Sequence, residues 1–408
     1  MEKRINEKSI KMVKDYDEVI FDAESDFFAF VKSEKEATEE KKLPLNALAP
    51  KGVEYSTFFD DKKAFGSSRV YADMEVPDVL APENEFFMDS LEDKGGQMFI
   101  PVPEVNKYIW VPVRAQAYAS LLNIAGLACK GMKNTSDEGA FFSVPPETRA
   151  DIIDTFLQRA KPVTSKKMTG PRMGTVIIVN RKVNYFGSSD YLLLTDDLVF
   201  NSVRDALKED YADAAMTSAV FTYEKTVADF QLNDDELNDQ FGEVIGDDDT
   251  DVKTGIRVVN SASGNSAARV LPYVEIEGKK IAFDSTKENF VVKHYGKEKD
   301  VKTLFSDELG KFIKNSFGEL DELIEELGNT ELKNPAKVVQ DIIKNVKFLN
   351  KNDAKVKMAE ASNMKEATAI DVVLLLADDT AVVTQRWLFM LDYKAIDNGT
   401  YSWANFKK

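Results

Sequence analysis

The sequence predicts an α+β protein: a mixed, largely antiparallel β core, preceded by an N-terminal helical arm and followed by a helical C-terminal region. Runs of β-branched and aromatic residues, separated by turn residues, fill the middle of the 408-residue chain and are typical of antiparallel strands. After about residue 300 the apolar residues recur with helical spacing instead. We therefore divide the chain into an arm (1–44), an α+β core (45–300) and a C-terminal region (301–408).

The arm is rich in Lys and Glu and has apolar residues at loosely helical intervals, among them Val19, Ile20, Phe27 and Phe28. Its charged tail, Ser33 to Lys42, is followed by Pro44. This spacing fits an ordinary amphipathic cap on the core, and it also fits an arm that binds a partner. The sequence leaves both interpretations open.

Two helices are predicted early in the core, one over 114–129 and one from Pro145-Pro146 onward. The second has its apolar residues on one face: Ile152, Ile153, Phe156 and Leu157. Before them, 99–103 and 108–113 have the composition of short extended segments, with prolines that favour edges or turns.

The strands of the core come next. Thr175 to Val179 is a strand by residue type, with 183–186 and 191–194 as its predicted neighbours. Thr195 stands where it can cap the following helix. Further strands are predicted over 219–223, 226–232, 255–259, 267–277 and 280–284, with hairpin turns at Glu224-Lys225 and at Gly278.

In the C-terminal region an apolar stripe from Leu309 to Leu327 predicts one long helix. Asn334-Pro335 is typical of the start of a second helix. Asn363, with Glu366 three residues later, resembles a capping box that opens a helix reaching Leu376. For 382–391 the pattern fits both a strand and a final helix.

The residue inventory argues against most common enzyme chemistry. The chain has one cysteine (Cys129) and one histidine (His294), so a zinc site of the Cys/His type lacks the ligands that it needs. His294 lies in a Lys-rich segment away from any Gly-x-Ser-x-Gly elbow, and the sequence has neither a Walker-type phosphate loop nor a Gly-x-Gly-x-x-Gly motif. We therefore predict no catalytic residues, no metal site and no cofactor.

Two acidic features leave alternatives to that prediction. Asp247 to Asp251 is rich in Asp, but Val252 and Val258 occupy positions where an EF-hand needs Gly and Glu, so a solvated loop is favoured over weak divalent-ion binding. Glu277-Gly278-Lys279 matches the Glu-x-Lys half of a Mg²⁺-dependent nuclease site. A hairpin tip is, however, an ordinary place for exposed Glu and Lys.

One stretch opposes the overall charge of the chain. Net charge is −17, yet the segment from Lys161 to Lys182, which we call the basic strip, has six basic residues and no acid: Lys161, Lys166, Lys167, Arg172, Arg181 and Lys182. Tyr185 and Tyr191 follow it. Cations for phosphates and rings for base stacking are what single-stranded nucleic acid requires, so the last five of these cations and the two tyrosines are candidate nucleic-acid contacts. Alternatively the basic strip pairs with the acidic segment 229–251, or the tyrosines belong to the core.

Three segments stand out together: Ser189-Asp190-Tyr191 with Asp196-Asp197, the run from Gly255 to Ala267, and the run from Ala367 to Asp371. They resemble the phage- and plasmid-type family catalogued as domain of unknown function 932, over roughly residues 165–392. The Cys-x-Asn-Gly-like motif of that family has no cysteine at the corresponding Phe283 to Thr286. The resemblance implies a phage or mobile-element origin and no particular reaction.

Within the second segment, Asn260 to Ser266 reads as a polar loop between two strands, bracketed by Arg257 and Arg269. Asn, Ser and Gly favour turns and offer backbone N–H groups to an anion. We therefore add Arg257, Asn260, Ser261 and Arg269 to the candidate nucleic-acid contacts. A plain structural connection between the strands is the alternative.

The leading functional hypothesis is a non-enzymatic phage or mobile-element protein that binds single-stranded nucleic acid, such as single-stranded DNA, in DNA recombination or replication. A homo-oligomer is a further possible partner. The second hypothesis is a phage structural or protein-interaction component whose acidic surface meets a basic partner, and the third is the nuclease. No run approaches the ~18 apolar residues of a membrane helix, and Met1 to Arg4 leads into charged residues rather than a signal peptide. We therefore expect a cytoplasmic protein, in the host cell if phage-encoded, without membrane partners.

Overall fold

In the computed structural model of the chain, the described residues are 18–54, 96–104, 107–127, 146–160, 163–165, 168–245, 251–261, 267–284, 290–346, 349–365, 367–377 and 382–402. They form the predicted mixed α+β fold with antiparallel sheets. No helix in this part of the chain is both long enough and apolar enough for a membrane crossing.

The largest sheet has seven strands, all paired antiparallel. Its order is β1 (Val19–Phe21), β10 (Ala215–Phe221), β11 (Thr226–Gln231), β12 (Val252–Asn260), β13 (Ala268–Ile276) and β14 (Lys279–Ala282), and β15 (Phe290–Val292) also pairs with β13. Both predicted hairpins are confirmed, because β10 pairs with β11 and β13 with β14. Glu277 and Gly278 have φ of 49° and 77°, as a tight turn of the primed type requires.

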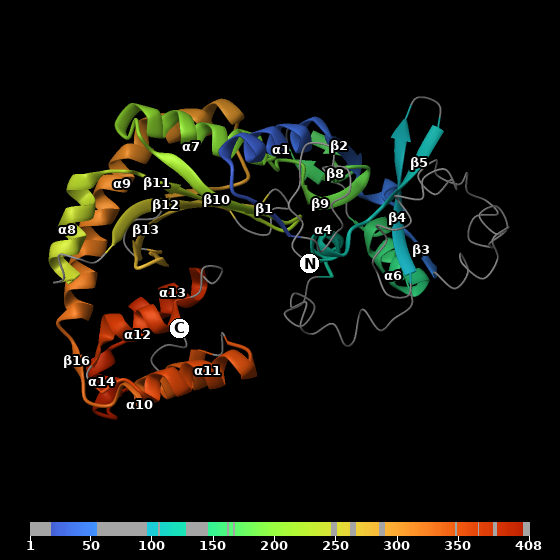
Figure 1. Ribbon diagram of the computed structural model, residues 1–408. Coiled ribbons are helices and arrows are strands. Elements are labelled where there is room, and N and C mark those ends of the chain that lie inside the picture. The colour runs from blue at the N-terminus through green and yellow to red at the C-terminus, as the bar shows by residue number, and fades with distance from the viewer. Residues whose placement is uncertain are drawn as a thin grey trace.

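Helices α1 (Glu24–Glu36), α7 (Asp196–Asp210), α8 (Asp235–Ile245) and α9 (Glu298–Gly328) pack on one face of this sheet (Figure 1). Alternate strand residues such as Phe230, Ile256 and Val258 point to this layer and form the main core with it. The long α9 confirms the helix predicted from Leu309 to Leu327. Thr195 caps α7 as expected, since its Oγ1 accepts a hydrogen bond of 3.2 Å from the backbone N–H of Leu198.

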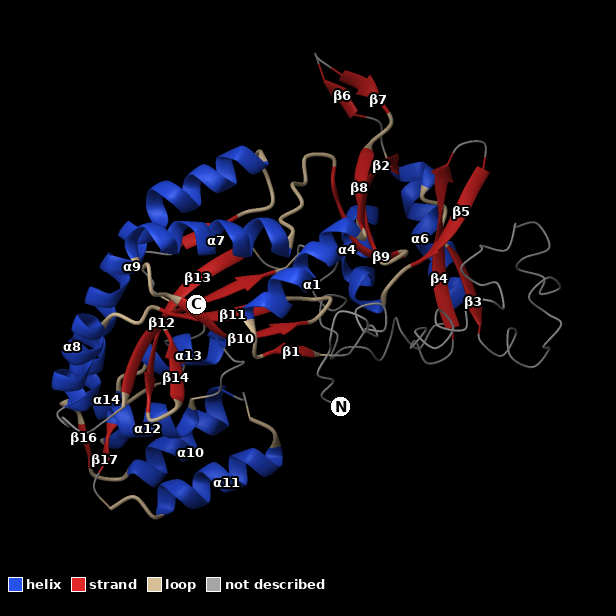
Figure 2. Cartoon of the chain, turned by 45° about the horizontal axis from the view of Figure 1, so that its top comes forward, coloured by secondary structure: helices blue, strands red, loops and turns tan. Residues whose placement is uncertain are grey.

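A second, smaller lobe combines two three-stranded sheets with two helices. One sheet has the order β2 (Thr38–Pro44), β8 (Met173–Val179) and β9 (Lys182–Ser188), and the other the order β3 (Lys51–Glu54), β4 (Gly96–Glu104) and β5 (Lys107–Pro112). The helices are α4 (Tyr118–Ala125) and α6 (Pro146–Gln158), with short 3₁₀ turns at Leu45–Ala47 and Ala115–Ala117. A separate hairpin of β6 (Val163–Ser165) and β7 (Met168–Gly170) projects from this lobe, as Figure 2 shows.

Strand β8 joins the two lobes. Ile177 and Val179 belong to the main core, whereas Val176 and Ile178 belong to the core of the smaller lobe. A strand buried on both faces needs apolar residues at every position, which explains the unbroken run from Val176 to Val179. The register of β8 against β9 shifts between Ile177 and Ile178, and this bulge leaves Asn184 without a direct partner across the strands.

The C-terminal helices lie on the other side of the large sheet from α7 (Figure 1). They are α10 (Pro335–Val346), α11 (Lys351–Ser362), α12 (Ala369–Leu376), α13 (Val382–Phe389) and α14 (Tyr393–Asp397), with the short pair β16 (Glu331–Leu332) and β17 (Ala367–Thr368). Asn334 caps α10 as predicted, with its Oδ1 accepting a hydrogen bond of 3.0 Å from the N–H of Lys337.

Two expectations for this region need correction or completion. The capping box lies at Thr368 and Asp371, not at Asn363, which instead ends α11. The prediction of one helix from Asn363 to Leu376 is therefore wrong, because β17 separates α11 from α12. The segment 382–391, for which a strand and a helix were both open, is mostly the helix α13.

The N-terminal arm was also predicted incorrectly as a helical unit. Residues 1–17 lie outside the described part, but 19–44 form β1, α1 and β2, and these pair with β10, pack against α7 and pair with β8. Phe27 and Phe30 are buried in the main core, as the cap interpretation requires. The segment Thr38–Pro44 has the composition of a linker because β2 is an edge strand, and charged side chains are typical of edges.

One predicted strand is absent from the described residues. Residues 191–194, expected beside 183–186, have no strand pairing. The backbone N–H of Leu192 instead donates a hydrogen bond of 2.8 Å to the carbonyl oxygen of His294. This segment therefore connects β9 to α7 and, through His294, lies against the end of β15.

Candidate functional site

The basic strip does not form one continuous face. Lys161, Lys166 and Lys167 lie outside the described residues. Arg172 and Arg181 are exposed, but they flank β8 at opposite ends, roughly 20 Å apart for a strand of this length. Lys182 is buried, so its predicted role as a surface contact is wrong.

The two tyrosines after the basic strip also separate. Tyr191 is buried, and its ring stacks on the His294 ring with centroids 5.0 Å apart and planes 8° apart. The prediction of Tyr191 as an exposed stacking ring is therefore wrong, and His294 is packed rather than free on the surface. Tyr185 is only half-buried, and its ring centroid is 4.6 Å from that of Tyr191.

Arg172 and Tyr185 meet at a groove. Its volume is about 480 Å³, and it is lined by Leu45, Ile124, Arg172, Tyr185 and the backbone turn Gly187 to Ser189, among others. Gly187 permits the close packing behind Tyr185, since a Cβ there would lie 2.8 Å from the Cβ and Cγ of Tyr191. The groove therefore offers a guanidinium and a ring that is held in place from behind.

Arg257 is not available to a ligand either. Its side chain is 3% exposed and makes two hydrogen bonds to Asp229, from Nε to Oδ1 at 2.8 Å and from Nη2 to Oδ2 at 2.9 Å. The Nζ of Lys280 is 3.0 Å from the same Oδ2. Burial alone would raise the pKa of Asp229, but the hydrogen bonds and charges of Arg257 and Lys280 outweigh it and lower that pKa. Arg257 is therefore held by Asp229 inside the large sheet, and its prediction as a nucleic-acid contact is wrong.

Asn260 and Ser261 are buried as well, which corrects their assignment to a surface loop. Ser261 Oγ donates a hydrogen bond of 2.7 Å to the carbonyl oxygen of Glu224. Asn260 Nδ2 donates to Asp196 Oδ1 at 2.7 Å and to the carbonyl oxygen of Leu194 at 2.9 Å. Residues 262–266 lie outside the described part. Arg269, by contrast, keeps a partly exposed side chain.

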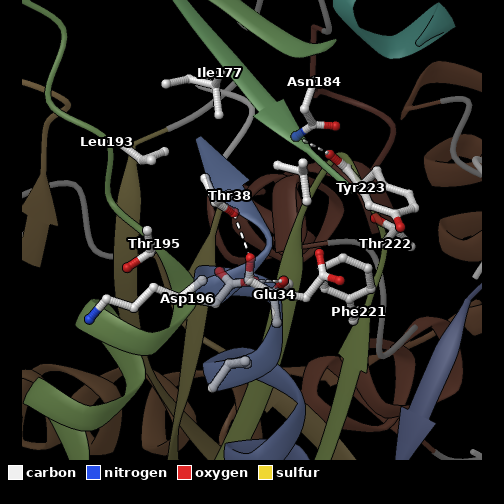
Figure 3. A pocket seen from close by; sticks show the side chains of 14 residues that line it. Glu34, Thr38, Ile177, Asn184, Leu193, Thr195, Asp196, Phe221, Thr222 and Tyr223 are labelled. Carbon is white, nitrogen blue, oxygen red and sulfur yellow. Dashed lines mark hydrogen bonds between the residues drawn. The ribbon is translucent and has the colours of Figure 1, made fainter. Parts of the chain in front are cut away.

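Asp196 also lines a small cavity between the lobes (Figure 3). Glu34 from α1, Asn184 from the bulge in β9, Asp196 from the start of α7 and Tyr223 from the β10–β11 turn line it. Its volume is about 30 Å³, which is room for one or two water molecules. Asn184 Oδ1 and Asn260 Oδ1 accept no hydrogen bond from any described residue.

Two carboxyl groups dominate the electrostatics of this cavity. Burial raises the pKa of Glu34 to about 7, against the opposing hydrogen bond of 2.7 Å from Asn180 and the charge of Arg114, while the charge of Asp196 raises it further. Burial also raises the pKa of Asp196 to about 6, although Thr226 and Asn260 donate hydrogen bonds to it. Both carboxyls therefore ionise closer to neutral pH than exposed ones do, but the cavity is too small for an organic substrate.

Two acidic features of the sequence remain, the hairpin tip at Glu277 to Lys279 and the Asp-rich loop. Glu277 and Lys279 are exposed at the hairpin tip. Residues 246–250 of the Asp-rich loop lie outside the described part, and Asp251 pairs with Lys253 at 2.7 Å. Within the described ranges, no group of three or more His, Cys, Asp or Glu side chains could hold a metal ion.

Sequence reasoning did not single out Glu34 or Asn184, which line the small cavity between the lobes. Glu34 lies in what reads as a charged linker, and Asn184 acquires its position only through the bulge. Two of the segments quoted for the family resemblance, 189–197 and 255–267, meet where Asn260 binds Asp196. The third segment lies elsewhere, as the capping box of α12.

Comparisons with protein-family models, with curated proteins and with solved structures give no match for this chain. The resemblance to the family of domain of unknown function 932 therefore stays a prediction.

Proposed function

We propose that the chain binds single-stranded nucleic acid in the groove between Arg172 and Tyr185. The observation that supports this most directly is that an exposed guanidinium and a half-buried tyrosine ring line one groove of about 480 Å³. That volume falls within the range of small-ligand sites, about 300–1,000 Å³. A role in recombination or replication, and a phage or mobile-element origin, belong to the same proposal.

The physics of the groove suits a single strand better than a duplex. A guanidinium attracts a phosphate, and a base stacks on a tyrosine face only when it is not already paired and stacked within a helix. Tyr185 is braced by Tyr191, which is itself stacked on His294, so little side-chain entropy remains to be lost on binding. Ser165 and Met168 pair in the projecting hairpin of β6 and β7. Lys166 and Lys167 stand between these two residues in the sequence.

The net charge of −17 limits how many phosphates the chain can neutralise. Binding should therefore depend on a few contacts rather than on a broad basic surface. For single strands the slope of log affinity against log salt is about −0.7 per phosphate contact, so a shallow slope is expected.

The test is a fluorescence-anisotropy titration of a labelled single-stranded oligonucleotide at about 50 mM and about 200 mM salt. Arg172→Gln and Tyr185→Leu should each weaken binding about tenfold, the second because Leu keeps the packing on Tyr191 but removes the stacking face. Arg181→Gln removes the same charge at the other end of β8 and should leave affinity within about twofold.

Equal losses from Arg172→Gln and Arg181→Gln would mean diffuse electrostatic attraction and would exclude the groove. No binding by the unaltered chain at low salt would exclude the function itself. A duplex of the same sequence should bind more weakly, because its bases are not free to stack.

A second candidate is a protein-interaction role through the acidic surface. It is favoured by a groove of about 500 Å³ between α7 and α9, lined by the carboxylates Asp197, Asp205, Glu209 and Glu298. Only Lys35 and Lys302 among its lining residues are basic, and Lys35 already pairs with Asp197 at 2.7 Å. Under this alternative the oligonucleotide would fail to bind while a short polylysine peptide would bind.

A further inference from the structure

Two arginines from distant parts of the chain converge on one aspartate. Arg269 lies on β13, Asp284 follows β14, and Arg386 lies on α13. Arg269 Nη1 donates a hydrogen bond of 3.2 Å to Asp284 Oδ2, and Arg386 Nη1 is 3.5 Å from the same oxygen atom. The two guanidiniums are therefore close neighbours, although 117 positions separate them in the sequence.

Buried contacts fix the positions of Asp284 and of the helix that carries Arg386. Asp284 is 5% exposed, so its carboxylate is a buried anchor rather than a surface group. Phe283, next to it in the chain, packs edge-on against Phe389 of α13 with ring centroids 5.4 Å apart. Phe389 lies three residues after Arg386, one helical turn away, so this contact fixes α13 against the end of β14.

The charge of this trio is not balanced. Two guanidiniums and one carboxylate leave a net charge of +1, and each arginine side chain is 40% exposed. A guanidinium has five N–H donors, and among the described residues Asp284 is the only acceptor that either arginine contacts. Arg257 is the contrast on the same sheet, because its side chain is 3% exposed and makes two hydrogen bonds to Asp229.

We infer that Arg269 and Arg386 form a binding site for a phosphate group, with Asp284 as the positioning residue. Planar guanidiniums match the oxygen atoms of a phosphate with paired hydrogen bonds, which a lysine pair would not do. A phosphate carrying a single negative charge, as in a phosphodiester, would neutralise the trio. The site does not depend on the groove at Arg172 and could exist without the function proposed for that groove.

The test uses the full-length chain and two probes. Inorganic phosphate, added at constant ionic strength with chloride as the reference anion, should raise the thermal midpoint of the unaltered chain. Arg386→Gln should abolish that shift, and Arg386→Lys should keep less than half of it because the fork geometry is lost. Arg181→Gln is the matched control for charge and should keep the full shift.

A single-stranded oligonucleotide is the second probe and identifies the source of the phosphate. If Arg386→Gln also weakens oligonucleotide binding several-fold, the site contacts a nucleic-acid backbone. If only the phosphate response is lost, the ligand is a small phosphate compound. Both results support the site.

The inference is overturned if phosphate and chloride shift the unaltered chain equally, or if Arg386→Gln responds like the unaltered chain. Arg172→Gln separates this site from the proposed function, since it should lower oligonucleotide affinity while leaving the phosphate shift intact. Arg269→Gln is the second variant, and it should reproduce the loss seen with Arg386→Gln if both arginines contact the same phosphate.

Discussion

Glu34→Gln should stabilise the folded chain at alkaline pH, which is unusual for the removal of a buried charge. Glu34 is 7% exposed, and Asp196, 6% exposed, is near enough for its charge to act on it. Glutamine has the shape of glutamate, stays neutral at every pH and can still accept the hydrogen bond that Asn180 donates to Glu34 Oε1. The substitution therefore removes the charge with little change in packing.

The size of this gain in folding stability follows from the shift in the pKa of Glu34. Burial raises the pKa of Glu34 from its ordinary value of 4.5 to about 7. One pKa unit corresponds to about 1.36 kcal/mol, so ionising Glu34 in the folded chain costs about 3 kcal/mol more than ionising it in the unfolded chain. A small part of this cost arises from the negative charge of Asp196. Burial also raises the pKa of Asp196, to about 6.

The sign of the pH dependence is fixed by the direction of the shift. Below pH 4.5 the carboxyl is protonated in both states, and its favourable contribution to folding is fully present. As pH rises from 4.5 through about 7, the folded state holds more protons than the unfolded state, so stability falls with rising pH. Asp196 adds a fall of the same sign between its ordinary value of 3.8 and about 6.

Urea denaturation of the unaltered chain and of Glu34→Gln at pH 5 and pH 8 measures this effect, with the free energy of unfolding as the readout. Glu34→Gln should be close to neutral at pH 5 and more stable by about 2–3 kcal/mol at pH 8. Asp196→Asn tests the second carboxyl: its amide nitrogen can donate to Thr226 Oγ1 while its oxygen still accepts from Asn260, so it should also gain stability relative to the unaltered chain between pH 5 and pH 8. If Glu34→Gln is equally destabilising at pH 5 and pH 8, the carboxyl is not the protonated group described here.

Two further pairs of substitutions, each a buried site with an exposed control, probe the packing around the large sheet. The urea midpoint of unfolding is the measurement. Asp229→Ala should destabilise by about 3–5 kcal/mol because it removes the buried carboxylate that Arg257 and Lys280 share, whereas Asp251→Ala, at an exposed pair with Lys253, should cost less than about 1 kcal/mol. Gly255→Ala should cost about 1–3 kcal/mol, since its Cβ would lie 2.3 Å from the ring of Tyr273 and 2.5 Å from the carbonyl oxygen of Phe230. Gly242→Ala in α8 meets nothing within 4 Å and should be neutral or stabilising. Similar effects from the two members of either pair would contradict the assignment.

Local sequence patterns predicted much of the fold correctly because they express local physics. The run from Val176 to Val179, the turn at Gly278 and the caps at Thr195 and Asn334 each depend on a few neighbouring residues. The failures are places where a distant partner decides the structure. Thr38–Pro44 becomes a strand because β8 pairs with it, and 191–194 remains outside the sheet despite its apolar residues.

The candidate site was harder to predict, because exposure is a property of the whole fold. Lysine is almost never fully buried, so a sequence gives no reason to suspect Lys182. Arg257 finds Asp229 only once β11 and β12 are paired, and Glu34 lies 146 positions from the Asn180 that binds it. Residue types alone identified the side chains that carry a positive charge or an aromatic ring, but not which of them stay exposed in the fold.

The positions of the basic residues in the sheets explain which of their side chains keep exposed surface. Inside a sheet, a charged side chain between two neighbouring strands must be paired, since an unpaired buried charge costs several kcal/mol, about 3–5 when a partner is removed. Arg257 and Lys280 lie inside the large sheet and share Asp229. Arg172, just before β8, is exposed, and Arg269, the second residue of β13, keeps a 40% exposed side chain although it pairs with Asp284. The two sites that we propose therefore combine an arginine near the start of a strand with a partner from a neighbouring strand or helix, Tyr185 for Arg172 and Arg386 for Arg269.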